Sequence, residues 1–131
     1  MKRLLVLGAG TAGTMAVNKL RPRLPRDEWT ITVVDSAQTH YYQPGYLFIP
    51  FGIYRPDEVA RPTEAFIPDG VDLVTGEIDR VFPDENAVVL MDGTRLGYDH
   101  LVIATGTSPR PDQTPGMDEG EWRDGVHEFY T

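Results

Sequence analysis

The chain has 131 residues, a formal net charge of −8 at pH 7 and no cysteine. This length suffices for one domain with a real core but is short for two. The negative charge argues against nucleic acid as a partner, because phosphate backbones are bound by clustered Lys and Arg. The lack of cysteine excludes disulfides, thiolate chemistry and iron–sulfur ligation within this stretch.

The chain shows no membrane-spanning or export segment. No run approaches the roughly 18 apolar residues that a membrane helix needs. The N-terminus resembles the charged opening of a signal peptide, but the apolar run behind it, at residues 4–7, is too short for one. The cytoplasm is therefore the expected compartment.

Three glycines with the spacing G-x-G-x-x-G follow the first apolar run. Residues 3–7 form that run, which is short and continuous and ends at glycine, as buried parallel strands do. A helical pattern opens inside the motif, and a second apolar run, residues 30–34, ends at Asp35. A strand, a glycine turn, a helix and an acid after the next strand form the context in which this motif binds a dinucleotide.

Each part of the motif has a physical role in holding a dinucleotide. Gly8 allows the tight turn, Gly10 lets a pyrophosphate approach the backbone, and Gly13 lets the helix pack close to the strand. The helix N-terminus offers free N–H groups and a positive dipole end to the phosphates. Asp35 can accept hydrogen bonds from the adenosine ribose and would repel a 2′-phosphate, which disfavours NADP and leaves NAD and FAD open.

The helix after the motif is expected to bury one face against the sheet. Ala12, Met15, Ala16 and Leu20 fall on one side at helical spacing. Pro22 then stops the helix.

The segment from residue 36 to residue 56, called the aromatic loop here, is irregular and rich in Tyr and Phe. A connection of about 20 residues without secondary structure is usually functional or disordered, and the aromatic content argues against disorder. Two interpretations remain equally open: a functional loop, and a segment that simply folds over the core.

The rest of the chain predicts an α/β domain followed by a connector. A short helix, a strand, a β-meander and a second buried strand are expected at residues 57–66, 71–75, 77–97 and 100–104. We therefore expect residues 1–106 to form a Rossmann-like domain with a parallel sheet and the meander as a crossover. Residues 107–131 are expected to be a connector towards a second domain of a larger chain.

No metal or catalytic residue is expected in this chain. The three histidines, His40, His100 and His127, have no ligand-like spacing and are interpreted as structural or solvated. Trp29 and Trp122 are interpreted as packing residues. Pairs of neighbouring acids lie in expected turns and connectors, where a solvated role is more common than acid–base catalysis.

Several stretches together resemble the pyridine nucleotide–disulfide oxidoreductase superfamily, flavoproteins with two dinucleotide-binding domains. They are the glycine motif at residues 8–13, Asp35, the meander and the phrase YDHLVIATG at residues 98–106. The phrase HYYQPGYLFIPFG at residues 40–52 is similar to the sulfide:quinone oxidoreductase branch, with type II NADH dehydrogenases as near relatives.

The resemblance implies that FAD is the cofactor. The positions that carry over to its binding are Gly8, Gly10, Thr11, Ala12, Gly13, Asp35, Ser36, Gln43, Pro44, Ile78, Ala104, Thr105 and Gly106. The glycine motif would line the pyrophosphate, the acid and its neighbour would hold the adenosine ribose, and the backbone of Ile78 would meet the adenine. The strand end at residues 104–106 would close on the cofactor, and Gln43 with Pro44 would lie near the flavin ring.

The resemblance also implies an activity for the full enzyme, in which electrons pass from sulfide through FAD to quinone. The redox cysteines, the second nucleotide domain and any membrane-binding region would lie outside this chain, which has no thiol and is not expected to turn over sulfide alone. An NADH:quinone oxidoreductase and a non-catalytic nucleotide-binding module are the alternatives. Peripheral attachment to the inner face of the cell membrane is the alternative to a free cytoplasmic enzyme, and an unpaired sheet edge is expected to make the chain self-associate.

Overall fold

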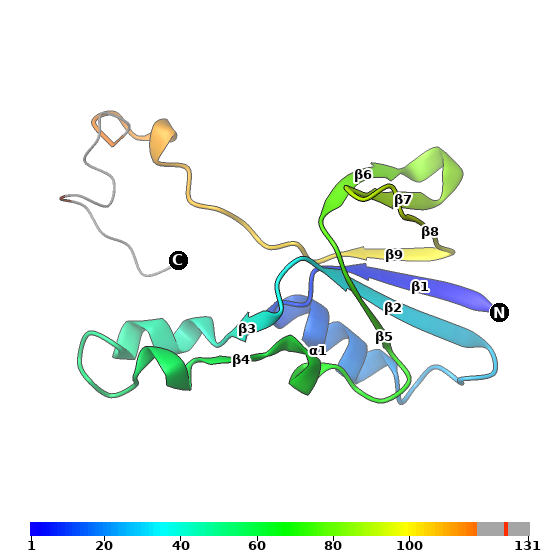
Figure 1. Cartoon of the computed structure of the whole chain (residues 1–131), viewed down its shortest axis with the longest axis horizontal. Helices are drawn as coiled ribbons and strands as arrows, with labels where there is room; N and C mark the ends of the chain where they lie inside the picture. Colours follow the sequence, from blue (N-terminus) through cyan, green and yellow to red (C-terminus); the bar gives the residue numbers. More distant parts are fainter. Residues whose placement is uncertain (118–124, 126–131) are drawn as a thin grey trace. The chain divides into compact units, whose positions relative to one another are not determined.

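The computed structural model of the chain describes residues 1–117 and 125 (Figure 1). The chain divides into two compact units, one made of Met1–Tyr41 and Ala60–Gly106 and the other of Tyr42–Val59 and Thr107–Thr131. Trp122 and His127 lie outside the described residues. Among the described residues, no helix is long and apolar enough to cross a membrane.

A four-stranded parallel sheet forms the centre of the first unit, in the order β5-β2-β1-β9 (Figure 1). Its strands are β1 (Lys2–Leu7), β2 (Trp29–Asp35), β5 (Asp72–Thr75) and β9 (His100–Ile103). The helix α1 (Thr11–Leu20) connects β1 to β2. The predicted Rossmann-like α/β fold is therefore confirmed.

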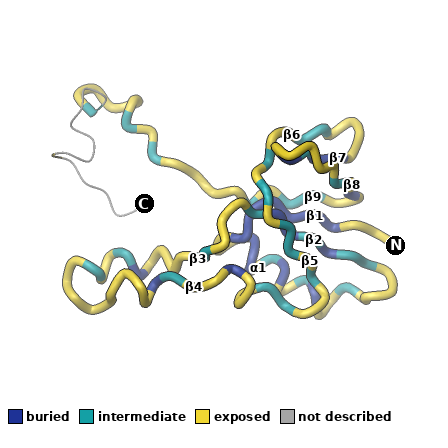
Figure 2. The backbone as a smooth tube through the Cα atoms, viewed as in Figure 1, coloured by how far each residue is buried: buried dark blue, intermediate teal, exposed yellow. Residues whose placement is uncertain are grey.

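The sheet is buried on both faces, which explains why its strands read as continuous apolar runs. Alternate residues of a strand point to opposite faces, and two separate cores result. The core on the helix side joins Val17 of α1 to Leu4, Val6, Ile31 and Val33. The core on the other side contains Leu5, Leu7, Val34, Val88, Leu90 and Tyr98. Figure 2 shows buried backbone, in dark blue, along the central strands and α1.

The second core is closed by the predicted β-meander, which is confirmed. Its antiparallel strands are β6 (Ile78–Phe82), β7 (Ala87–Leu90) and β8 (Arg95–Gly97). The first turn contains the 3-10 turn η4 (Pro83–Glu85) and the left-handed Asn86, with φ of 49°. The second is the tight turn at Gly93, whose φ is 85°.

The helix predicted at residues 57–66 is wrong. The structure instead has a 3-10 turn η2 (Pro56–Glu58), a strand β4 (Ala60–Pro62) and a 3-10 turn η3 (Thr63–Phe66). The residue before a proline is disfavoured in the α conformation, so Arg61 is extended ahead of Pro62.

The extended backbone of β4 then finds a partner in the aromatic loop. It pairs antiparallel with β3 (Thr39–Tyr41), so this loop is less irregular than expected. A 3-10 helix η1 (Gln43–Phe48) follows in the second unit. Tertiary pairing has therefore overridden the local helical pattern.

The predicted buried face of α1 is wrong for Ala12 and Met15, which are exposed, whereas Leu20 is half-buried and packs against the core on the helix side. The buried residues of the helix are Gly13, Thr14 and Val17, whereas Met15 is 52% exposed. The helix is rotated because Gly13 packs against the backbone of β1's end, which brings the smallest residue to the sheet. The spacing of apolar residues in the sequence does not reveal this backbone contact.

The buried side chain of Arg21 forms hydrogen bonds to two loops near the end of α1. Arg21 is 7% exposed, and its Nη1 donates to the carbonyl oxygen of Gly70 at 3.1 Å while its Nη2 donates to that of Leu24. No carboxylate pairs with it among the described residues. Arg21 therefore serves as a hydrogen-bond donor that joins the α1–β2 connection to the loop before β5.

We expect Arg21→Met to lower the free energy of unfolding by about 1–3 kcal/mol, because the carbonyl oxygens of Gly70 and Leu24 lose their donor while the side-chain stem is kept. The matched control is Arg23→Met at a neighbouring exposed arginine, which should stay within about 0.5 kcal/mol of the unchanged protein. Urea denaturation followed by circular dichroism measures both. Equal effects for the two variants would contradict the role assigned to Arg21.

The strand β9 leaves a sheet edge open. It pairs with β1, and the described residues provide no strand on its other side. Unpaired N–H and C=O groups on an edge can bond to another chain, and the exposed Ile103 adds apolar surface there. We therefore expect the isolated protein to self-associate, as measured by light scattering coupled to gel filtration. A single monomeric species at every concentration would count against this expectation.

Candidate functional site: the glycine turn

The turn after β1 has no room for side chains at two of its glycines. Gly8 has φ of +97°, and a Cβ built on it would lie 2.3 Å from the carbonyl oxygen of Ala104. A Cβ on Gly13 would lie 1.8 Å from the carbonyl oxygen of Gly8. Both distances are far below van der Waals contact, so the packing of the chain itself requires these two glycines.

Gly10 is different, because no packing contact within the described part of the chain requires it to be glycine. It is exposed, its φ of −70° suits any residue, and a Cβ there would meet no atom within 4 Å. The open space lies beside the N-terminus of α1. The absence of a side chain at Gly10 leaves the backbone beside the helix N-terminus accessible, as close approach of a ligand would require.

The N-terminus of α1 can hold an anion at this place. The first N–H groups of a helix have no intrahelical acceptor, and Gly10 has no side chain that could cap them. No acidic residue lies in the first turn. Thr11 and Ala12 are both exposed there. Free donors and the positive end of the helix dipole suit a phosphate group.

Asp35, at the end of β2, holds the turn in place. Its Oδ2 accepts a hydrogen bond from the backbone N–H of Ala9, and its Oδ1 accepts one from Ala37 at 2.7 Å. A carboxylate has about four acceptor sites, and these two hydrogen bonds occupy two of them. The same negative charge would repel a phosphate on the ribose. Ser36 beside it is exposed.

The end of β9 lies against the same turn. The backbone N–H of Ala104 donates to the carbonyl oxygen of Leu7 at 2.7 Å, and Thr105 lies close to Gly8. Gly106 follows with φ of +77° and is exposed. In the sheet, β2 and β5 lie on one side of β1, and β9 lies on its other side. The turn is thus at the carboxyl end of the strands where the strand order reverses, which is where open α/β sheets bind ligands.

The remaining predicted site residues are placed less directly. The backbone N–H of Gly76 donates to the carbonyl oxygen of Asp35 at 2.9 Å, which brings the start of the meander to the end of β2. Ile78, two residues on, is half-buried and pairs with Leu90. Gln43 and Pro44 are exposed in η1 of the second unit, and their position near a flavin ring stays a prediction.

Sequence reasoning missed one residue at this site. The Nδ1 of His40 lies 3.0 Å from the carbonyl oxygen of Ala9, and its ring centroid lies 4.3 Å from that of Phe66. His40 lies in β3, whose position depends on its pairing with β4. No spacing in the sequence indicates that contact, because the wrong helix prediction for residues 57–66 left β3 without a partner.

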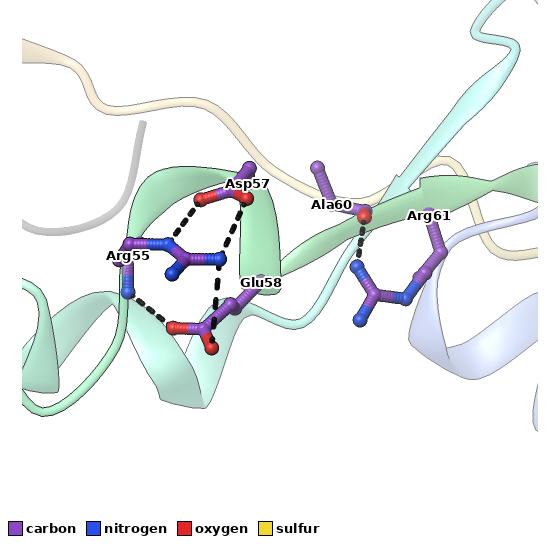
Figure 3. A network of polar contacts seen from close by, with 5 residues as sticks. All are labelled: Arg55, Asp57, Glu58, Ala60 and Arg61. Carbon is purple, nitrogen blue, oxygen red and sulfur yellow. Dashed lines mark hydrogen bonds and ion pairs between the residues drawn. The ribbon is translucent and has the colours of Figure 1, made fainter.

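Three charged side chains of the second unit, at residues 55, 57 and 58, pair with one another. Arg55 pairs with Asp57 through Nε–Oδ1 and Nη2–Oδ2 distances of 3.0 and 3.1 Å, and its backbone N–H donates to Glu58 (Figure 3). The hydrogen bond with Asp57 raises the pKa of Arg55 above its ordinary value. These side chains are exposed and close a turn. No group of three metal-binding side chains gathers among the described residues.

The fold and the glycine turn define an α/β protein of the dinucleotide-binding class. The sequence pattern of the pyridine nucleotide-disulphide oxidoreductases matches residues 2–129. The chain belongs to this family of flavin-dependent oxidoreductases, which confirms the resemblance seen in its sequence.

The curated relatives include two kinds of quinone oxidoreductase. The mitochondrial sulfide:quinone oxidoreductase of Dictyostelium discoideum is 28% identical over 129 residues, covering 98% of this chain and 28% of the relative. A type II NADH:quinone oxidoreductase of Staphylococcus aureus is 31% identical over 106 residues, covering 80% of this chain and 26% of the relative. The chain thus spans little more than a quarter of the length of these proteins.

Solved structures share the fold. The sulfide:quinone oxidoreductase of Aquifex aeolicus superposes with a TM-score of 0.71 at 23% identity, over 82% of this chain and 25% of that one. The covalent putidaredoxin reductase–putidaredoxin complex gives a TM-score of 0.69 at 27% identity, over 84% of this chain and 27% of that one. Both likenesses support the assignment of the fold.

Substituting Gly13 and Gly10 by alanine should change the stability of the ligand-free protein by different amounts. Gly13→Ala should lower the free energy of unfolding by about 2 kcal/mol or more, because its Cβ overlaps the backbone of Gly8. Gly10→Ala should change it by less than about 0.5 kcal/mol, since its Cβ enters open space. Urea denaturation without ligand separates the two. Similar losses for both variants would show that Gly10 has a packing role.

Proposed function

We propose that the chain binds FAD at the glycine turn and forms part of the flavin site of an oxidoreductase. The observation that carries this proposal is Gly10, which the protein's own packing does not require and which lies open beside the free N–H groups of α1. The family supports FAD over NAD as the dinucleotide. Bound flavin would supply the electron-transfer chemistry, and the protein would supply binding and orientation.

The residues at the turn fit the parts of this cofactor. Gly8, Gly10, Thr11, Ala12 and Gly13 would line the pyrophosphate. The carboxylate of Asp35 would accept hydrogen bonds from the adenosine ribose, with Ser36 beside it. The backbone at Ile78 would meet the adenine, the segment Ala104, Thr105 and Gly106 would close over the turn, and Gln43 with Pro44 would lie near the flavin ring.

For the whole enzyme, we favour transfer of electrons from sulfide through FAD to quinone. The sulfide:quinone oxidoreductases among the relatives support this, with one of them aligned over nearly the whole chain. The relatives named as type II NADH:quinone oxidoreductases support NADH as an alternative donor. Residues 1–106 would form the first part of the FAD domain and residues 107–131 a connector. We propose a cytoplasmic enzyme or one attached peripherally to the inner face of the cell membrane.

The test of cofactor binding is titration of the purified chain with FAD, followed by flavin fluorescence. The unchanged protein should bind FAD, and bound ligand should raise its thermal unfolding midpoint. Gly10→Ala should weaken binding by about tenfold or more, equivalent to about 1.4 kcal/mol. The reason is that its methyl group would occupy the space through which the pyrophosphate approaches.

The matched control is Gly125→Ala, because a Cβ at Gly125 also meets no atom within 4 Å. This variant should bind FAD like the unchanged protein. ADP-ribose serves as a second probe that has the ribose and pyrophosphate but no flavin. Protein that neither binds FAD nor gains thermal stability from it would support the non-catalytic module instead.

A further inference from the structure

Two side chains from the same segment hold Ala9, the residue between the first two glycines of the turn. Its backbone N–H donates to Asp35 at the end of β2. Its carbonyl oxygen lies 3.0 Å from Nδ1 of His40 in β3. Ala9 itself is 2% exposed. Both backbone polar groups of Ala9, which belong to two successive peptide units, are thus bonded to side chains at the end of β2 and in β3.

The contact determines which nitrogen of His40 carries a proton. A carbonyl oxygen can only accept a hydrogen bond, so Nδ1 must be the donor. The ring is supported by Phe66, at 4.3 Å between centroids. The backbone of His40 pairs with Arg61 across the β3–β4 ribbon. The imidazole is therefore held by packing as well as by the hydrogen bond.

The position of Phe66 is in turn fixed by α1. The Nδ2 of Asn18 donates to the carbonyl oxygen of Phe66 at 2.7 Å and to that of Thr14 at 2.9 Å. The helix that offers its N-terminus to the ligand is thus connected through Asn18 and Phe66 to the His40 ring. These contacts connect the His40 ring, and with it the Nδ1 donor, to α1.

Fixing the carbonyl oxygen of Ala9 also fixes the next N–H group. In a planar trans peptide, the C=O of one residue and the N–H of the next point in opposite directions, and the described residues contain no cis peptide bond. The N–H of Gly10 therefore points away from His40. The carbonyl oxygen of Gly10 is held by Thr14, through its backbone N–H at 3.0 Å and its Oγ1 at 2.9 Å. The Ala9–Gly10 peptide plane is held separately by His40, and because glycine is conformationally permissive, loss of that hydrogen bond would remove a restraint on rotation of this plane.

We propose that His40 is a positioning residue of the dinucleotide site. Its Nδ1–H holds the Ala9–Gly10 peptide so that the Gly10 N–H is preset to donate to a pyrophosphate oxygen. The inference rests on the proposed FAD site, and it adds a role for a histidine outside the glycine motif. Preset donors bind more tightly because less conformational freedom is lost when the ligand arrives.

The experiment compares His40→Phe with His40→Asn. Phe keeps an aromatic ring against Phe66 but has no donor, whereas the amide of Asn can donate near the place of Nδ1. His40→Phe should weaken FAD binding about fivefold or more, and the Gly10 amide signal in a ¹⁵N NMR spectrum of the ligand-free protein should shift or broaden. His40→Asn should restore FAD affinity to within about twofold of the unchanged protein.

Two results would overturn the proposal: His40→Phe with unchanged FAD affinity and an unchanged Gly10 signal, or His40→Asn as weak as His40→Phe. If His40→Phe does not fold, His40→Leu replaces it, because Leu matches Asn in shape and lacks the donor. If even the unchanged protein does not bind FAD, the proposed function fails. The Gly10 amide signal in the ligand-free variants then still decides whether His40 holds the peptide.

Discussion

The fold depends on a contact between backbone atoms that leaves no space for a side chain. The start of α1 rests on the end of β1 through Gly13, and the end of β9 rests on the same turn through Gly8. These contacts set the rotation of the helix about its axis, and so they select Val17 for the core and leave Met15 in solvent. The helix end and its free N–H groups are positioned by the same constraint.

The sequence predicted the parts of the fold that depend on burial and on local turn chemistry. The apolar runs of β1, β2 and β9 are continuous because both faces of the sheet are covered, and the meander has clear turn residues. The prediction of a helix at residues 57–66 failed because the pairing of β4 with β3 is a tertiary interaction, which the local sequence does not reveal. The rotation of α1 was missed for the same kind of reason.

The candidate site was predictable to a similar extent. The glycine spacing and the acid at Asp35 indicated a dinucleotide, but they did not show that the acid also bonds to the backbone of the turn. The contact between His40 and Ala9 was beyond sequence reasoning, since it needs the β3–β4 ribbon. The difference between Gly10, which faces open space, and Gly8 and Gly13, which the packing requires, is a property of the three-dimensional structure.

The β3–β4 ribbon has a consequence for how such a protein can evolve. Tyr41 pairs with Ala60, and the backbone N–H of Tyr42 donates to the carbonyl oxygen of Val59 at 2.8 Å. The chain therefore leaves the ribbon and re-enters it at neighbouring points, so residues 42–59 form a closed excursion. Such a segment can be exchanged or lengthened at little entropic cost, and selection can alter its chemistry while the parallel sheet stays unchanged.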